Sequence, residues 1–236
     1  MLKLLFSILF FSAWSLCQAQ DSPYYNDAIQ LAARLVVNNL SADIPEHLVY
    51  SIEDALVAVA ESPSVAARSV SHKYDIHTSP IANTNNVRII VGKETKWLKD
   101  LSKSPIHKML PAYTFDIKMA EETDSYIVLD VSSQTPLNMK FVANELSILD
   151  DIWMVELPSN HMDGNDIKLR KINEGFIITY SYKTGNCSTG CEETHYWEFG
   201  VEPDGSITFI GEHGSDLANS KTDEEYFFTL LEEIRP

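Results

Sequence analysis

The sequence predicts an α+β protein with N-terminal helices, a βαβ unit, and a C-terminal antiparallel meander that is closed by a last helix. Three observations lead to this prediction. Apolar residues recur at helical spacing over residues 23–62. After residue 113, short runs rich in β-branched and aromatic residues take their place. One helical pattern, at 137–149, separates two of these runs.

The chain begins with a predicted secretory signal peptide, residues 1–19. It carries one lysine, an apolar run and an exit of small residues. We expect cleavage after Ala19, so the mature protein is predicted to be secreted or periplasmic. No later stretch approaches the roughly 20 apolar residues that a membrane-spanning helix needs, and no membrane span is expected.

Two amphipathic helices should open the mature chain. The first follows Ser22-Pro23, and the second is expected over residues 45–62, where Asp43 and Glu46 have the spacing of a capping box. Their apolar stripes consist of Ala28, Leu31, Ala32 and Leu35 in the first helix, and of Leu48, Ile52, Ala55, Leu56 and Val59 in the second. Residues 63–86 are expected to form a connection that ends in a polar loop.

A hairpin and a βαβ unit should follow. A short strand at 87–91 and one or two helical turns at 95–103 precede them. The predicted elements are strands 114–119 and 125–132, helix 137–149, and strand 151–157. The crossover through the helix should be right-handed.

The remainder of the chain is expected to form the meander and the closing helix. The four predicted strands are 166–172, 175–182, 195–201 and 206–212, and the helix is 222–234, with Thr222 and Glu225 as a capping box. We expect a mainly helical region at 20–110 and a sheet region at 111–236, or one continuous domain over 20–236.

Charge disfavours two classes of partner. The chain has 34 acidic and 18 basic residues and a formal net charge of −16, which becomes −17 when Lys3 leaves with the signal peptide. Binding to nucleic acids or anionic membranes draws on clustered lysine and arginine. Neither partner is therefore expected.

The most distinctive chemical feature is the segment "TGNCSTGCEETHYWEF", which holds Cys187, Cys191 and His195. Because both cysteines are exported, we expect a disulfide that closes the long loop 183–194. Two alternatives remain. The spacing Cys-x3-Cys-x3-His resembles that of the binuclear copper centre of cytochrome oxidase subunit II, although Glu198 stands where that site has methionine. The second alternative is a redox-active pair, although such pairs normally have Cys-x-x-Cys spacing and here three residues separate the cysteines.

Several segments resemble ones that recur in uncharacterised secreted proteins of Bacteroidota. They are "CSTGCEETHYWEF", with its C-x-x-G-C and H-Y-W-x-F patterns, "GNDI", "IPEHLV" and "DIHTSP". The resemblance implies a secreted bacterial protein without a known activity, and it supplies no catalytic residues.

The sequence favours a binding module that recognises an extracellular or cell-surface molecule. Neither a serine-hydrolase elbow nor a zinc-protease motif occurs, and no cofactor is expected. Tyr182, Tyr196 and Trp197, beside the cysteine loop, are the candidate interaction surface, since aromatic residues dominate binding energy. The alternatives are a copper-thiolate protein that uses Cys187, Cys191 and His195, and a hydrolase without a recognisable motif.

Overall fold

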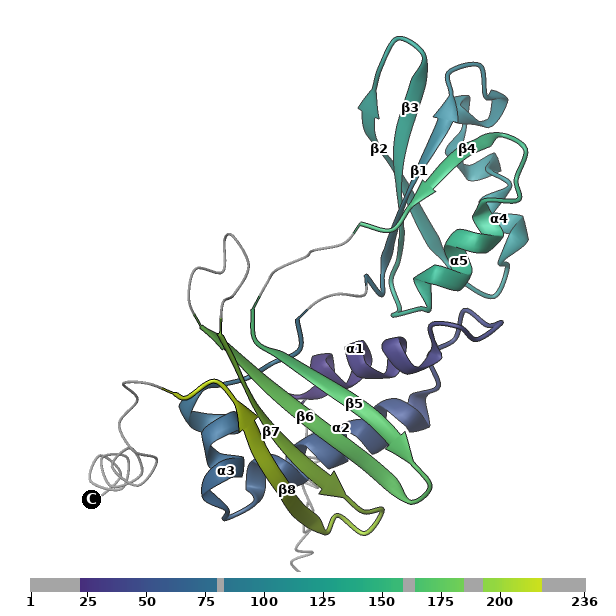
Figure 1. Cartoon of the computed structure of the whole chain (residues 1–236). Helices are drawn as coiled ribbons and strands as arrows, with labels where there is room; N and C mark the ends of the chain where they lie inside the picture. Colours follow the sequence, from purple (N-terminus) through teal and green to yellow (C-terminus); the bar gives the residue numbers. More distant parts are fainter. Residues whose placement is uncertain (1–21, 80–82, 159–163, 185–192, 218–236) are drawn as a thin grey trace, which may run out of the picture.

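A computed structural model describes residues 22–79, 83–158, 164–184 and 193–217 (Figure 1). It contains helices and two four-stranded antiparallel sheets, with strand orders β2-β3-β1-β4 and β5-β6-β7-β8, which confirms the α+β class. The predicted signal peptide and the predicted helix 222–234 lie outside the described residues. None of the helices in the described part of the chain is both long and apolar enough to cross a membrane.

The two predicted N-terminal helices are α1 (Tyr25–Val36) and α2 (Glu46–Glu61). They pack on each other through the predicted stripes, and Leu31, Ile52, Leu56 and Val59 are at most 1 % exposed. The predicted capping box is wrong. Pro45 stands at the N-cap without a side-chain cap, and the Asp43 carboxylate instead accepts a hydrogen bond from Tyr113 Oη at 2.7 Å.

The connection after α2 is more helical than the sequence indicated. Ser64 caps the short helix α3 (Val65–Arg68), because its Oγ accepts from Ala67 N at 3.2 Å. A π-helical turn, η1 (Ser69–Lys73), continues directly from α3. The irregular segment 74–79 follows this turn and leads toward the second sheet.

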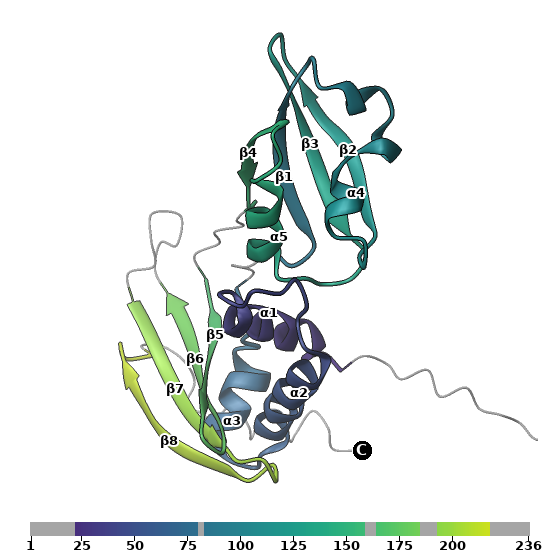
Figure 2. The same cartoon turned by 90° about the vertical axis from the view of Figure 1, so that its right-hand side faces the viewer.

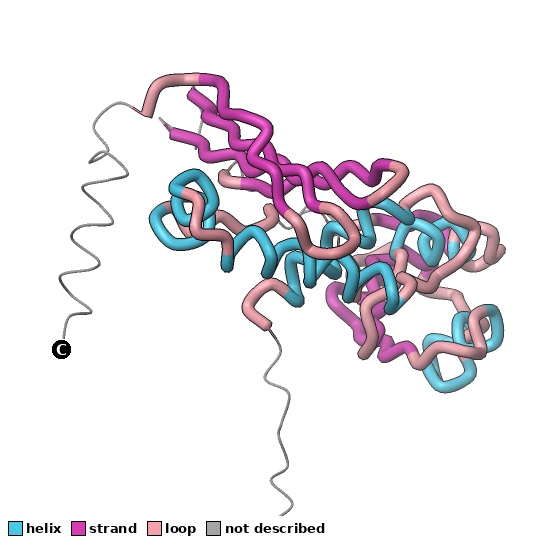
Figure 3. Tube along the Cα trace, turned by 90° about the horizontal axis from the view of Figure 1, so that it is seen from below, coloured by secondary structure: helices cyan, strands magenta, loops and turns pink. Residues whose placement is uncertain are grey.

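The C-terminal sheet is the predicted meander. Its strands are β5 (Asp166–Ile172), β6 (Gly175–Thr184), β7 (Glu193–Val201) and β8 (Ile207–Gly214). Helices α1, α2 and α3 cover one face of this sheet, as Figures 2 and 3 show. The core between the two layers includes Ile178, Tyr180, Trp197 and Phe199, each at most 2 % exposed. We call residues 22–79 and 164–217 the base lobe.

The other sheet belongs to residues 83–158, which we call the inserted lobe. Its elements are β1 (Asn86–Gly92), β2 (Phe115–Glu122), β3 (Tyr126–Ser133), α5 (Met139–Leu146) and β4 (Ile152–Glu156). The predicted βαβ unit is present in split form. β1 lies between β3 and β4 and pairs antiparallel with both, so β3 and β4 run parallel without touching.

Short helical segments help α5 to cover one face of this inserted sheet. They are η2 (Lys96–Lys99), η3 (Leu101–Lys103) and α4 (Ile106–Met109). Trp97 and Ile106 are buried beside Val142 and Leu146 in a second core. Residues on both sides of position 110 pack together in this core.

The two lobes are joined where the α1–α2 loop meets the start of α5. Ala42, from that loop, is 2 % exposed within the second core, and its carbonyl accepts from Asn138 N at 2.8 Å. Asn138 Nδ2 donates to Val36 O at 2.9 Å and to Ser41 O at 3.2 Å. Asn138 is 3 % exposed, and these bonds fix the inserted lobe on the end of α1.

Candidate functional site

The cysteine segment lies largely outside the described residues, which include neither Cys187 nor Cys191. The predicted disulfide and the copper alternative therefore stay predictions. His195 is described. Its Nδ1 donates to Ser215 O at 2.8 Å, and its Nε2 lies 3.7 Å from Glu212 Oε2. Within the described ranges, no three histidine, cysteine, aspartate or glutamate side chains gather as a metal site.

The three residues of the predicted aromatic surface lie in different environments. Trp197 is 1 % exposed and packs between the sheet and the helices, with its ring 5.4 Å from that of Tyr74. Tyr182 is half-buried against the same Tyr74 ring, at 4.5 Å. Tyr196 points to the opposite face, where it stacks on His213 at 5.0 Å. Strand alternation separates Tyr196 from Trp197, so the three side chains form no common surface.

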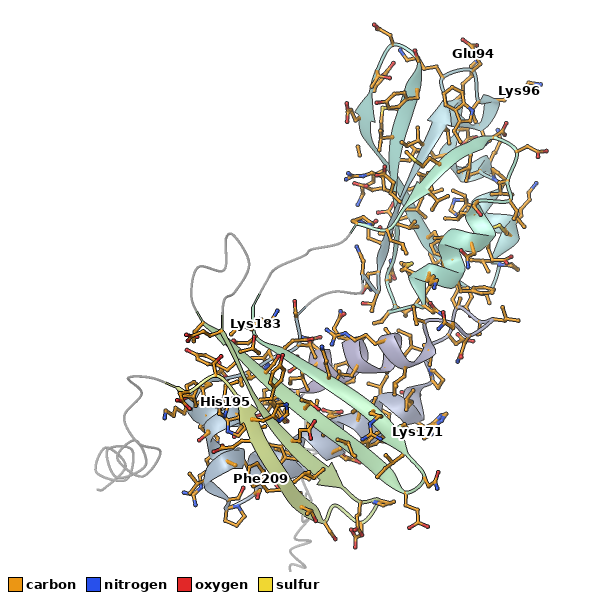
Figure 4. All side chains as sticks on the ribbon, viewed as in Figure 1. Glu94, Lys96, Lys171, Lys183, His195 and Phe209 are labelled. Atoms are coloured by element: carbon orange, nitrogen blue, oxygen red, sulfur yellow. The ribbon has the colours of Figure 1, made fainter. Side chains whose placement is uncertain are left out.

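Figure 4 shows His195 toward the Lys183 end of the base-lobe sheet and Phe209 toward the other end. Phe209 is 41 % exposed on the edge strand β8. The apolar exposure of this sheet thus lies away from the predicted cysteine-loop surface.

A buried carboxylate on α1 organises the segment 77–79. Asp27 is 4 % exposed and accepts from Thr78 N at 2.7 Å, from Thr78 Oγ1 at 2.6 Å and from His77 Nδ1 at 2.6 Å. On the other side of the ring, Asp75 Oδ1 lies 3.3 Å from His77 Nε2. Asp75 holds this position with φ of 46°, in the left-handed region that favours glycine.

The two carboxylates decide the charge of His77. Burial lowers the pKa of its imidazole, but hydrogen bonding and the charge of Asp27, supported by Asp75, outweigh burial and raise the pKa above its usual 6.5. An imidazole that donates from both nitrogens must be protonated. Because Nε2 faces a carboxylate and not a hydroxyl or thiol, this arrangement favours a structural role over that of a catalytic base.

A second ionic cluster lies one residue further along the same segment. Arg34 Nη2 contacts Asp166 Oδ1 at 3.0 Å, and Arg34 Nη1 donates to Ile167 O at 2.7 Å. Asp166, which is 5 % exposed, also accepts from Ser79 N at 2.8 Å. Together with Asp27, this cluster clamps residues 77–79 just before the chain enters the inserted lobe.

The most prominent exposed aromatic side chain lies on the inserted lobe. Trp153 of β4 is 63 % exposed. It is the extra residue of a bulge, since Ile90 pairs with Met154 and Val91 with Ile152. Its ring lies over Gly92, where an added Cβ would be only 2.5 Å from Trp153 Cζ2. The glycine therefore allows the indole to lie directly on the sheet.

The strand register arranges the face around Trp153 in rows. Val128, Ile90 and Met154 stand opposite one another on β3, β1 and β4 and form an apolar row. The neighbouring row is ionic and alternates in charge; it consists of Lys118, Asp130, Arg88 and Glu156. Arg88 Nε donates to Asp130 Oδ1 at 3.0 Å. We call these seven residues, with Gly92 and Trp153, the Trp153 face.

The helices of the inserted lobe pack on the opposite side of the sheet from the Trp153 face. Met154 is 47 % exposed, and Leu157, just after β4, is 42 % exposed. Sequence reasoning missed this face because "DIWMVEL" has four consecutive apolar residues, Ile152 to Val155, and such a run does not show which of them is exposed. A bulge has no reliable sequence signature, and the role of Gly92 depends on Trp153, which is 61 positions away.

No protein-family model, curated protein or solved structure matches the chain. The resemblance to secreted proteins of Bacteroidota stays a prediction. Function has to be inferred from the geometry of the chain itself.

Proposed function

We propose that this chain is an exported binding protein that recognises another extracellular or cell-surface molecule through the Trp153 face. The observation that carries the proposal is the position of Trp153, which is 63 % exposed and lies over Gly92. Tryptophan is enriched among the residues that dominate binding energy. An indole that already rests on a sheet loses little conformational freedom when a partner covers it.

The rows beside Trp153 favour a protein as the partner. An apolar row flanked by charges has the arrangement of protein interfaces, in which a desolvated centre is surrounded by a polar rim. The ionic row alternates in charge over Lys118, Asp130, Arg88 and Glu156. This row would select a partner whose surface carries the opposite charges in the same order.

The test compares three purified variants in capture experiments on exported proteins, followed by titration with each captured protein after its own purification. Trp153→Ala should weaken binding by roughly 30-fold or more, as expected for a residue worth about 2 kcal/mol. Gly92→Ala should also weaken binding, because its Cβ displaces the indole. Phe209→Ala removes a comparably exposed ring from the base lobe and is the control.

Trp153→Ala and Gly92→Ala should keep a melting curve close to that of the wild type, since neither removes a core side chain. Phe209→Ala should lose more stability, because the Phe209 ring lies 5.3 Å from that of the core residue Phe199. The proposal fails if Trp153→Ala binds the purified partner as tightly as the wild type does. It also fails if Phe209→Ala is the variant that loses binding.

A further inference from the structure

The inserted sheet has an open edge at β4, directly beside the Trp153 face. β4 stands at one end of the strand order β2-β3-β1-β4, and in the described part of the chain it pairs with β1 alone. Figure 2 shows β4 at the left-hand edge of this sheet. The N–H and C=O groups of alternate β4 residues therefore point away from β1. Such an edge can accept a further strand.

Proteins usually protect open edges with charged side chains, and β4 has little of this protection. It has one charged residue, Glu156, at its C-terminal end. Trp153 is 63 % exposed and Met154 is 47 % exposed. The opposite edge of the same sheet, β2, has four charged residues in a strand of eight, namely Asp116, Lys118, Glu121 and Glu122. β4 is therefore the edge of this sheet that is suited to pairing with another chain.

The bulge at Trp153 does not extend to the rest of the strand. Met154, Val155 and Glu156 pair with consecutive residues of β1, so this part of β4 has a regular register. Leu157, the next residue, is 42 % exposed. The end of β4 is thus both regular and accessible.

Two rows of side chains end at this edge. The apolar row ends with Met154, and the ionic row, which alternates in charge, ends with Glu156. Asp130 raises the pKa of Arg88 most, through its hydrogen bond with Arg88 Nε, and Glu156 contributes less. The Glu156 carboxylate is therefore only weakly compensated within the sheet. A cation on an added strand would continue the alternation, because residues that stand opposite each other on neighbouring strands interact directly.

The charge of β4 argues against a second copy of this chain as the added strand. β4 reads "IWMVE" and contains no basic residue, so two β4 strands that pair with each other place no cation opposite Glu156. In antiparallel pairing, the residue two positions after the one opposite Glu156 stands opposite Met154. The matching segment therefore has a basic residue, then any residue, then an apolar residue.

We propose that the partner of the Trp153 face adds an extended segment to β4 as a fifth antiparallel strand. Its basic residue lies opposite Glu156, and its apolar residue lies opposite Met154. The added backbone hydrogen bonds supply affinity, and the two side chains supply selectivity. This inference rests on the function proposed above, because the added strand continues the same face.

The test titrates the mature chain with short acetylated peptides and follows its backbone amide signals by NMR. In the first peptide, threonine alternates with lysine, isoleucine and valine, in that order. The second peptide has glutamate in place of lysine. The lysine peptide should bind saturably, shift the β4 signals, and bind about 5-fold more tightly than the glutamate peptide.

Two further peptides keep the lysine sequence and are N-methylated at alternate residues, one at the odd and one at the even positions. One of them should lose binding, because it lacks the N–H groups that face β4. The other should keep binding, since its methyl groups point away from the sheet.

Variants of Glu156 identify the edge. Glu156→Lys should reverse the preference between the lysine and glutamate peptides, and Glu156→Gln should abolish it. Glu156 is exposed, so both variants should fold normally. Glu121→Lys makes the same change at an exposed position of β2, on the opposite edge, and should keep the wild-type preference.

The proposal is overturned if the lysine peptide does not bind saturably, if the two N-methylated peptides bind equally, or if Glu121→Lys changes the preference as much as Glu156→Lys does. Slow hydrogen exchange of all β4 amides in the free monomer would place another segment of this chain on the edge. A dimer that pairs through β4 would place a second copy there. Either result also overturns the proposal.

The function proposed above fails or stands on a different result. If it fails, Trp153→Ala binds the captured partner as tightly as the wild type does. If only strand addition fails, Trp153→Ala still weakens that binding, while the peptides show no dependence on Glu156 or on N-methylation.

Discussion

At the scale of the residue, His77 is the side chain whose chemistry is set most clearly by its surroundings. Asp27 on α1 and Asp75 within the same segment contact its two ring nitrogens, and the ring of Tyr24 lies 6.2 Å away. Both carboxylates favour the imidazolium. His77 and Asp27 together fix the point at which the chain leaves the base lobe.

We predict that the pKa of His77 exceeds 6.5 in the folded protein and falls in Asp27→Asn. A titration of the imidazole signals by NMR measures both values. Because the folded pKa is the higher one, protonated His77 contributes its full stability below pH 6.5, and this contribution is lost as the pH rises through the folded pKa.

The stability difference between the wild type and His77→Gln should therefore be larger at pH 6 than at pH 8. Urea unfolding at the two pH values measures it. An unchanged difference, or a His77 pKa at or below 6.5, would show that the carboxylates do not hold the charge.

The sequence indicated little of this network. "DIHTSP" is distinguished only by its resemblance to segments of other proteins. Asp27 belongs to a helix for which the sequence pattern predicts only an apolar stripe. The partners are fifty residues apart, and such pairing depends on the tertiary fold, which local periodicity does not encode.

At the scale of the element, β7 shows how strand alternation places neighbouring residues on opposite faces of the sheet. Trp197 and Phe199 face the helices, while Tyr196 and Glu198 face outward. Strand alternation alone predicts this division. The strand pattern does not show whether the inward-facing side is core or surface, because that depends on the helices that cover it.

We predict that Trp197→Ala destabilises the protein by about 3–5 kcal/mol, because it opens a cavity in the core. Tyr196→Ala should cost about 1 kcal/mol or less, as for other partly exposed sites. Trp197→Phe should cost less than Trp197→Ala, since it keeps a ring and removes an indole N–H that has no acceptor. Equal losses for Tyr196→Ala and Trp197→Ala in urea unfolding would contradict the assignment.

Element positions were predicted better than element pairing. The long helices and most strands were found from periodicity, because their buried faces are regular. The π-helical turn η1, the short helix α4 and the bulge at Trp153 were missed. Each of these depends on contacts with distant residues, and none has a strong local pattern.

At the scale of the whole molecule, the joint between the lobes includes one buried side-chain amide, beside the buried Ala42 and the Tyr113–Asp43 hydrogen bond. Asn138 caps α5 by accepting from Phe141 N at 3.4 Å, and it donates to two carbonyls at the end of α1 and in the loop that follows. The change of periodicity after residue 113 suggests a division near residue 110. The sequence does not show that the base lobe is built from two separate stretches, because sequence patterns do not reveal which strands share a sheet.

We predict that Asn138→Ala lowers the free energy of unfolding by about 1–3 kcal/mol, since it removes two hydrogen bonds that join the lobes, leaves Ser41 O without this donor and removes a helix cap. Calorimetry should also show the two cores unfolding less cooperatively. Asn144→Ala, at an exposed position of the same helix, is the control and should behave like the wild type. A single unchanged transition in Asn138→Ala would mean that the lobes are joined mainly by other contacts.

The two lobes also differ in how much of the chain must emerge before each can form. All strands of the inserted sheet come from one continuous stretch, whereas Arg34 and Asp166 of the base lobe are 132 residues apart. During synthesis or export from the N-terminal end, α1 and α2 therefore appear long before the strands that cover them. The apolar faces that these helices turn toward the sheet therefore stay uncovered until strands β5 to β8 have been made. The inserted lobe can fold before that point.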